Sequence, residues 1–169
     1  SMADAAIRIA GAFKQACGNE LLVGVYGFYN LAQLHLIYRP ASSHHVAYTG
    51  IEKVLDCKDI DFIACIQSYA GVNGGTPVIT GMPDASLQKH RKLFLEEYDI
   101  RTFFTDLTFS HSHTTSRNET LNIIRRDFGE TLVRNNQCWF YGFARGFTGR
   151  RAVGWFSEQS LIDELNACH

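Results

Sequence analysis

The sequence predicts an α+β fold in which an N-terminal α/β module, residues 3–100, packs on a small C-terminal β-barrel, residues 101–163. Helical spacing and strand alternation are mixed in the first part, whereas the second part contains short strand-like segments separated by polar turns. The type of basic residue changes at the same boundary: all five lysines precede residue 101, and eight of the eleven arginines follow residue 100. We therefore expect two differently built parts in contact.

The composition is that of a globular protein. The chain has 169 residues, 46% hydrophobic and 20% charged, and this balance excludes disordered and collagen-like chains. The net charge of −1 does not favour nucleic acid as a partner. No apolar run reaches the roughly 18 residues of a membrane-spanning helix, so we expect no membrane insertion. The five scattered cysteines are typical of a reducing, cytoplasmic protein without a disulfide framework or structural zinc.

The first hundred residues contain the elements of an α/β module. A first helix is predicted by apolar residues at helical spacing and a following glycine: Ala6, Ala10, Phe13, Cys17 and Gly18. The patterns after it predict a hairpin of strands at 21–25 and 34–38, a short helix after the capping box Thr49–Glu52, strands at 60–69 and 77–80, and a helix from Asp84 to Tyr98. This element order resembles that of the roadblock and longin families, which implies a dimerisation surface and a homodimer.

The C-terminal part contains several strand-like segments. They are residues 102–109, 121–124, 132–133, 139–143 and 153–156, with a short helical turn at 157–161. The stretch 110–119 is too hydrophilic for a core, and residues 125–127 and 134–137 are typical of turns. Short strands at this spacing predict a small β-barrel or sandwich.

Four blocks of this part occur in a recognisable order. They are Phe103–Leu107, Leu121–Asp127, Trp139–Gly142 and Gly149–Phe156. They are similar, in that order, to the ALYDY strand, the diverging turn, the W-W-x-G strand and the following strands of an SH3 domain. The segment of about residues 102–162, roughly a third of the chain, thus resembles a divergent SH3 domain. The resemblance implies a barrel that binds peptides.

The resemblance also implies a binding groove, but most of its aromatic side chains are missing here. SH3 domains hold proline-rich peptides between parallel aromatic ridges. The ridge positions are occupied by Thr105, Leu107, Trp139, Ser157 and Ser160, so only Trp139 keeps its ring. The loop at 110–119 would add His111, His113 and Glu119 to the peptide contacts. We expect an adaptor or scaffold module whose groove for the PxxP motif is eroded.

Arginines form an alternative candidate site. Between Arg117 and Arg151 there are seven arginines and three acidic residues, a local excess of four positive charges. Guanidinium groups pair bidentately with carboxylates and phosphates. The alternative ligand is therefore anionic, an acidic peptide or nucleic acid, bound by Arg125, Arg126, Arg150 and Arg151. A self-associating structural module is a further alternative.

The sequence contains no recognisable catalytic motif. The segment Gly71–Thr76 lacks the G-K-[ST] ending of a phosphate loop, so we predict a hairpin turn there. The carboxylate pairs Glu96–Glu97 and Asp59/Asp61 are interpreted as solvated. The histidines at 111 and 113 have no third metal ligand nearby in the sequence. We predict a protein-interaction module that is not an enzyme and holds no metal or other cofactor.

Overall fold

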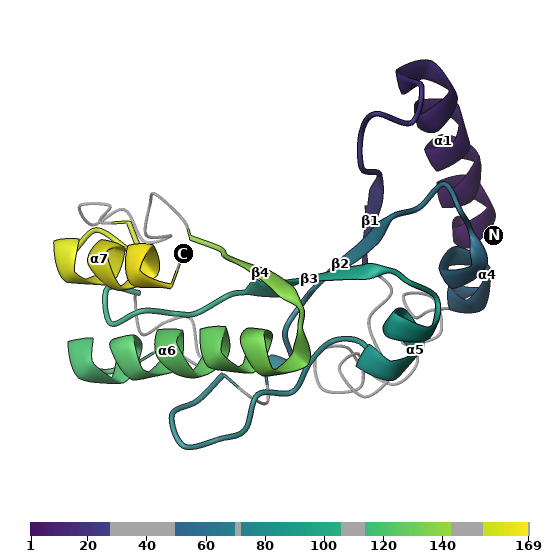
Figure 1. Ribbon diagram of the computed structural model, residues 1–169. Coiled ribbons are helices and arrows are strands. Elements are labelled where there is room, and N and C mark those ends of the chain that lie inside the picture. Colours follow the sequence, from purple (N-terminus) through teal and green to yellow (C-terminus); the bar gives the residue numbers. More distant parts are fainter. Residues whose placement is uncertain (28–49, 70–71, 106–113, 143–153, 169) are drawn as a thin grey trace. The chain divides into compact units, whose positions relative to one another are not determined.

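The computed structural model describes residues 1–27, 50–69, 72–105, 114–142 and 154–168, and it combines helices with one parallel sheet (Figure 1). The elements are α1 (Met2–Cys17), β1 (Gly24–Tyr26), α4 (Ile51–Asp56), β2 (Phe62–Ile66), α5 (Asp84–Lys89), β3 (Leu93–Tyr98), α6 (Arg117–Arg134), β4 (Gln137–Phe140) and α7 (Gln159–Ala167). The four strands lie in the order β1-β2-β3-β4. The predicted α+β class is confirmed at this level.

The chain divides into two compact units. Unit 1 comprises residues 1–66 and 80–96, and unit 2 comprises residues 67–79 and 97–169. Each unit has its own hydrophobic core. The core of unit 1 is built around Ile60, Ile63 and Phe94, and that of unit 2 around Tyr98 and Ile124. The predicted domains, residues 3–100 and 101–163, stay a prediction.

Unit 1 confirms the first predicted helix. Helix α1 begins with a capping box between Ser1 and Asp4 and ends at Gly18, whose left-handed backbone (φ 61°) closes the last turn. Strand β1 pairs in parallel with β2, so that Val25 lies opposite Ile63. The hairpin partner predicted at 34–38 lies outside the described residues. Helix α4 has Gly50 as its N-cap residue, not the predicted Thr49.

The helix predicted from Asp84 to Tyr98 is wrong in its second half. Helix α5 ends at Lys89, and the residues from Leu93 onward form strand β3. The backbone of Arg91 is left-handed (φ 55°), which ends helical geometry. Side chains in β3 then alternate, with Phe94, Glu96 and Tyr98 buried.

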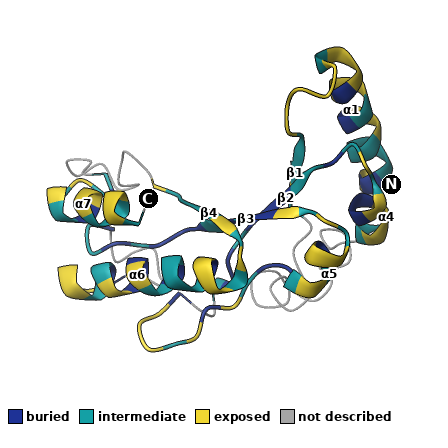
Figure 2. Ribbon diagram, viewed as in Figure 1, coloured by how far each residue is buried: buried dark blue, intermediate teal, exposed yellow. Residues whose placement is uncertain are grey.

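Unit 2 contains a long helix where the sequence analysis predicted a loop, a strand and a turn. Helix α6 covers the predicted strand 121–124 and the predicted turn 125–127, so both predictions are wrong. Its buried residues recur at helical spacing: Thr120, Ile123, Ile124, Asp127 and Thr131. Figure 2 shows buried and exposed positions mixed along α6. The hydroxyl of Ser116 caps the first turn by accepting from Glu119 N, 3.2 Å away.

The described residues of the C-terminal part do not form a barrel. The aromatic segment predicted at 139–143 contributes β4, a strand of the parallel sheet, and residues 159–167 form helix α7. An SH3-like barrel needs strands in the place that α6 occupies. Residues 106–113 and 143–153 lie outside the described part.

Helix α6 offers a direct test at Gly129. A Cβ atom at this position would meet no described atom within 4 Å, and the backbone is not left-handed. Because glycine in a helix interior is destabilising relative to alanine, Gly129→Ala should raise the free energy of unfolding by about 0.5–1 kcal/mol. Urea unfolding of both proteins measures this difference. A loss of stability would contradict a helix at this position.

Candidate functional site

Polar side chains of unit 2 gather where the chain leaves strands β2 and β3. Parallel α/β sheets bind their ligands at the carboxyl ends of the strands, where loops carry reactive side chains on a rigid scaffold. Gln67 N donates to Glu97 O over 3.0 Å, which keeps the two outgoing segments side by side. Ser68 N donates to Ile79 O, also over 3.0 Å, and closes the base of the loop that follows β2.

Asp99 is the central residue of this site. Its side chain is almost wholly inaccessible, since the residue is 3% exposed. The Oδ2 atom accepts from the Tyr69 hydroxyl at 2.5 Å and from Arg101 Nη2 at 2.8 Å. The Oδ1 atom is buried and accepts no hydrogen bond from the described residues. A buried carboxylate oxygen without a donor is rare in folded proteins and calls for an explanation.

Burial governs the protonation of Asp99 and Tyr69. Removal from water raises the pKa of Asp99, although the hydrogen bond from Tyr69 and the charge of Arg101 oppose this. Burial also raises the pKa of Tyr69, and its hydrogen bond to Asp99 raises it further. The Tyr69 phenol therefore stays protonated and keeps donating to Asp99.

Aromatic rings hold the guanidinium group of Arg101. Its Cζ atom lies 4.7 Å from the ring centroid of Trp155 and 6.0 Å from that of Tyr69, distances typical of cation–π contacts. Trp155 is buried, and its ring lies edge-on to Tyr141 with the centroids 6.2 Å apart. The Thr102 hydroxyl donates to Trp155 O. We call Tyr69, Asp99, Arg101 and Trp155 the Asp99 cluster.

Glu97 places a second carboxylate near the Asp99 cluster. Glu97 lies on β3 and Asp99 is the first residue after this strand, so their Cα atoms are at most about 7 Å apart. Glu97 Oε2 accepts from the indole N–H of Trp139 on β4, at 3.1 Å. The site thus combines carboxylates that accept hydrogen bonds, one guanidinium group and aromatic rings.

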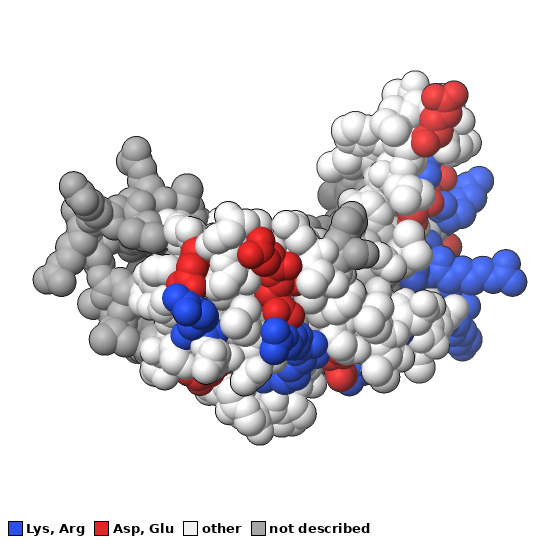
Figure 3. All heavy atoms as spheres, turned by 60° about the vertical axis from the view of Figure 1, so that its left-hand side comes forward, with Lys and Arg blue, Asp and Glu red and all other residues white. Residues whose placement is uncertain are grey.

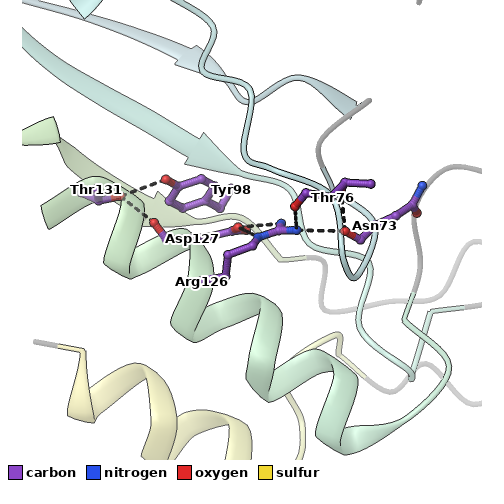
Figure 4. A network of polar contacts seen from close by, with 6 residues as sticks. All are labelled: Asn73, Thr76, Tyr98, Arg126, Asp127 and Thr131. Carbon is purple, nitrogen blue, oxygen red and sulfur yellow. Dashed lines mark hydrogen bonds and ion pairs between the residues drawn. The ribbon is translucent and has the colours of Figure 1, made fainter. Parts of the chain in front are cut away.

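An arginine of helix α6 holds the loop that follows β2 (Figure 4). Arg126 Nη1 donates to Asn73 O and to Thr76 O, at 2.9 Å each. Its Nε donates to Asp127 Oδ1 at 2.8 Å, and Asp127 is fully buried. Burial raises the pKa of Asp127 to about 6, while the charge of Arg126 opposes the rise. The Tyr98 hydroxyl and Thr131 Oγ1 share a hydrogen bond of 2.9 Å in the same network.

The predicted peptide-binding residues have local roles where the structure describes them. Trp139 is a strand residue that bonds to Glu97, and Thr105 is buried. Glu119 accepts from Thr115 N at 2.8 Å beside the first turn of α6. Ser157 donates to Gly154 O and Ser160 to Glu158. Leu107, His111 and His113 lie outside the described residues.

Two of the four arginines predicted to bind an anion are engaged within unit 2. Arg125 forms a bidentate pair with Glu164, through bonds of 2.7 and 2.6 Å, and this pair lowers the pKa of Glu164. Arg126 is committed to Asp127 and the loop. In the centre of Figure 3 basic and acidic groups adjoin, without a continuous basic patch on that part of the face. Arg150 and Arg151 lie outside the described residues.

Comparisons with known proteins add no further information. No family model, no curated protein and no solved structure matches this chain. Among the described helices none is long and apolar enough to cross a membrane. In the described ranges no three His, Cys, Asp or Glu side chains come together as a metal site would require. Any function must therefore be argued from the site itself.

The Asp99 cluster is not among the sites predicted from the sequence. The prediction of a solvated Glu96–Glu97 pair is wrong, because Glu96 is buried and accepts from Gly81 N at 3.2 Å, and Glu97 accepts from Trp139. The signal that was present is the alternation of Glu97, Asp99 and Arg101 at the end of a strand. This alternation predicts a polar site only if the segment is taken as a strand.

Proposed function

We propose that unit 2 binds a small, neutral ligand rich in hydroxyl groups, such as a sugar or another polyol, at the Asp99 cluster. The observation that carries the proposal is the buried Oδ1 atom of Asp99, which accepts no hydrogen bond from the described residues. A ligand hydroxyl would supply the missing donor and remove the penalty of an unsatisfied buried acceptor.

The charges of the cluster favour a neutral ligand. Asp99 and Arg101 already compensate each other through their 2.8 Å ion pair. An anion would bring an uncompensated charge close to the buried carboxylate of Asp99, which is unfavourable. The ring of Tyr141, which is partly exposed, adds apolar surface that suits the C–H face of a sugar or polyol ring.

Asp99→Asn should weaken binding of such a ligand by roughly tenfold or more, because hydrogen bonds to a charged group contribute about 1.5–3 kcal/mol. The assay follows the fluorescence of the two tryptophans while neutral monosaccharides, glycerol and inositol are added one at a time, with dicarboxylates as the anionic comparison. Asp163→Asn is the matched control, since Asp163 lies exposed on α7. Binding of dicarboxylates alone, or unchanged affinity in Asp99→Asn, would contradict the proposal.

The peptide-binding adaptor and the homodimer stay predictions from the sequence. Neither the peptide groove nor the dimer surface has support in a contact of the described residues. The bond between Trp139 and Glu97 speaks against the role first expected for this ring, because its polar edge is already engaged. The geometry favours the small-molecule site.

A further inference from the structure

The loop Asn73–Thr76 is held at defined points. Within the loop, Thr76 N donates to Asn73 O over 3.2 Å and the Thr76 hydroxyl donates to the same oxygen over 2.6 Å. Gly75 adopts a left-handed backbone (φ 78°), which makes the turn tight. A Cβ atom on Gly74 would lie 3.1 Å from Glu119 Oε1, so the loop passes close to helix α6.

Arg126 connects this loop to the helix and thereby to the site. Its two bonds to Asn73 O and Thr76 O hold the loop far from the base, where Ser68 N bonds to Ile79 O. Tyr69 belongs to the same connection between β2 and α5 and reaches Asp99 from it. Residues 77–79 join Thr76 to this base bond, which lies next to Tyr69, so fixing Thr76 limits the conformations open to Tyr69.

We propose that Arg126 is a positioning residue of the ligand site: it fixes the loop Asn73–Thr76 and thereby keeps the Tyr69 hydroxyl on Asp99. The inference rests on the proposed function, because it assigns Arg126 to the same site. Arg126 contacts Asp127, Asn73 and Thr76, and its effect on Asp99 passes through the loop.

The carboxylate of Asp127 orients Arg126 for this role. It lies 2.8 Å from Arg126 Nε and 2.7 Å from Nη2, which directs the remaining Nη1 donor toward the loop carbonyls. The other charged group acting on Asp127 from α6 is Glu130, and β3 contributes the Tyr98 phenol to the network. The loop contributes carbonyls and no charge at Asn73 and Thr76. Because Asp127 has a pKa of about 6, its hold on Arg126 should weaken as the pH falls through that value.

The test measures the loop and the tyrosine separately in the full chain. Amide hydrogen exchange of Thr76 reports the loop, the NMR signal of the Tyr69 ring reports its contact with Asp99, and sugar titration reports affinity. Arg126→Gln should speed Thr76 exchange roughly tenfold, shift the Tyr69 signal and weaken sugar binding severalfold, because two charge-assisted bonds are lost. Arg126→Lys should restore part of each effect, since it keeps the charge without the planar geometry.

A neighbouring residue provides the matched control. Arg125→Gln removes a guanidinium from the same helix and, among the described residues, breaks the exposed pair with Glu164, so the loop and Tyr69 should not respond. Wild-type Thr76 protection, corrected for intrinsic exchange, should fall below about pH 6. In Asp127→Asn the protection at neutral pH should already equal that low-pH level.

The outcomes separate this inference from the proposed function. Unchanged Thr76 exchange in Arg126→Gln overturns the positioning role of Arg126. Faster Thr76 exchange with an unmoved Tyr69 signal also overturns it, because Arg126 then fixes the loop without positioning Tyr69. If the Tyr69 signal moves but no neutral polyol binds the wild type, positioning of Tyr69 is supported and the proposed ligand is wrong.

Discussion

Replacing Asn122 by proline should lower the free energy of unfolding of unit 2 by about 3 kcal/mol or more. Asn122 lies exposed in the interior of α6, between the buried residues Thr120 and Ile123. Proline there removes a backbone hydrogen bond, and its ring clashes with the carbonyl one turn earlier. Urea unfolding followed by tryptophan fluorescence reports this unit, because Trp139 and Trp155 both belong to it.

A second substitution at the same position separates helix disruption from the loss of the asparagine. Asn122→Ala should leave unit 2 equally or slightly more stable, by roughly half a kcal/mol, because alanine is the better helix former. The changes in the free energy of unfolding caused by Asn122→Pro and Asn122→Ala should therefore have opposite signs or very different sizes. If proline were tolerated as well as alanine, residues 117–134 would not form a helix in solution.

Helix α6 was missed because its buried side is unusually polar. Three of its five buried residues are Thr120, Asp127 and Thr131, so the apolar periodicity that marks an amphipathic helix is diluted. Its most apolar pair, Leu132 and Val133, is 64% and 85% exposed. A search for apolar alternation therefore finds the short run at 121–124 and takes it for a strand.

Strand β3 was missed for the opposite reason. Leu93, Phe94 and Leu95 are consecutive apolar residues, and such a run fits a helix face as well as a strand buried on both sides. The pairing with neighbouring strands decides between them, for example the bond from Leu93 N to Asp61 O. That partner is 32 residues away and has no local signature.

Elements with complete local signals were predicted well. Helix α1 has helical spacing and a glycine that ends it, and β2 is rich in branched and aromatic residues, although it is shorter than predicted. The Asp99 cluster has no such signal. Tyr69, Asp99 and Trp155 lie far apart in the sequence. The neighbouring strands β2 and β3 bring Tyr69 and Asp99 together, whereas Trp155 comes from the segment before α7.

Asp127→Asn should make unit 2 about 2–3 kcal/mol more stable at pH 7, with the gain disappearing toward pH 4. The pKa of Asp127 is about 6 in the folded chain against an ordinary value of 3.8, because burial disfavours the charged form. Between these pH values the folded state binds more protons than the unfolded state. The free energy of unfolding therefore falls as the pH rises from about 4 to 6, and stays lower above that range.

The asparagine variant lacks this proton and should lose that part of the pH dependence. Urea unfolding measures the free energy of unfolding of wild type and variant at several pH values. The contributions of all other titrating groups cancel in the difference between these two free energies. A difference that does not change with pH would show that the carboxyl group of Asp127 titrates normally. A variant less stable at every pH would mean that the ion pair with Arg126 outweighs the burial of the charge.

This variant also separates the stability of the unit from the order of its loop. Asp127→Asn should raise the free energy of unfolding at neutral pH and at the same time reduce the protection of the Thr76 amide, because Arg126 loses the carboxylate that directs it. A residue with a purely structural role would change both quantities in the same direction. Opposite signs would therefore show that the buried carboxylate opposes global stability while it orders the loop beside the Asp99 cluster.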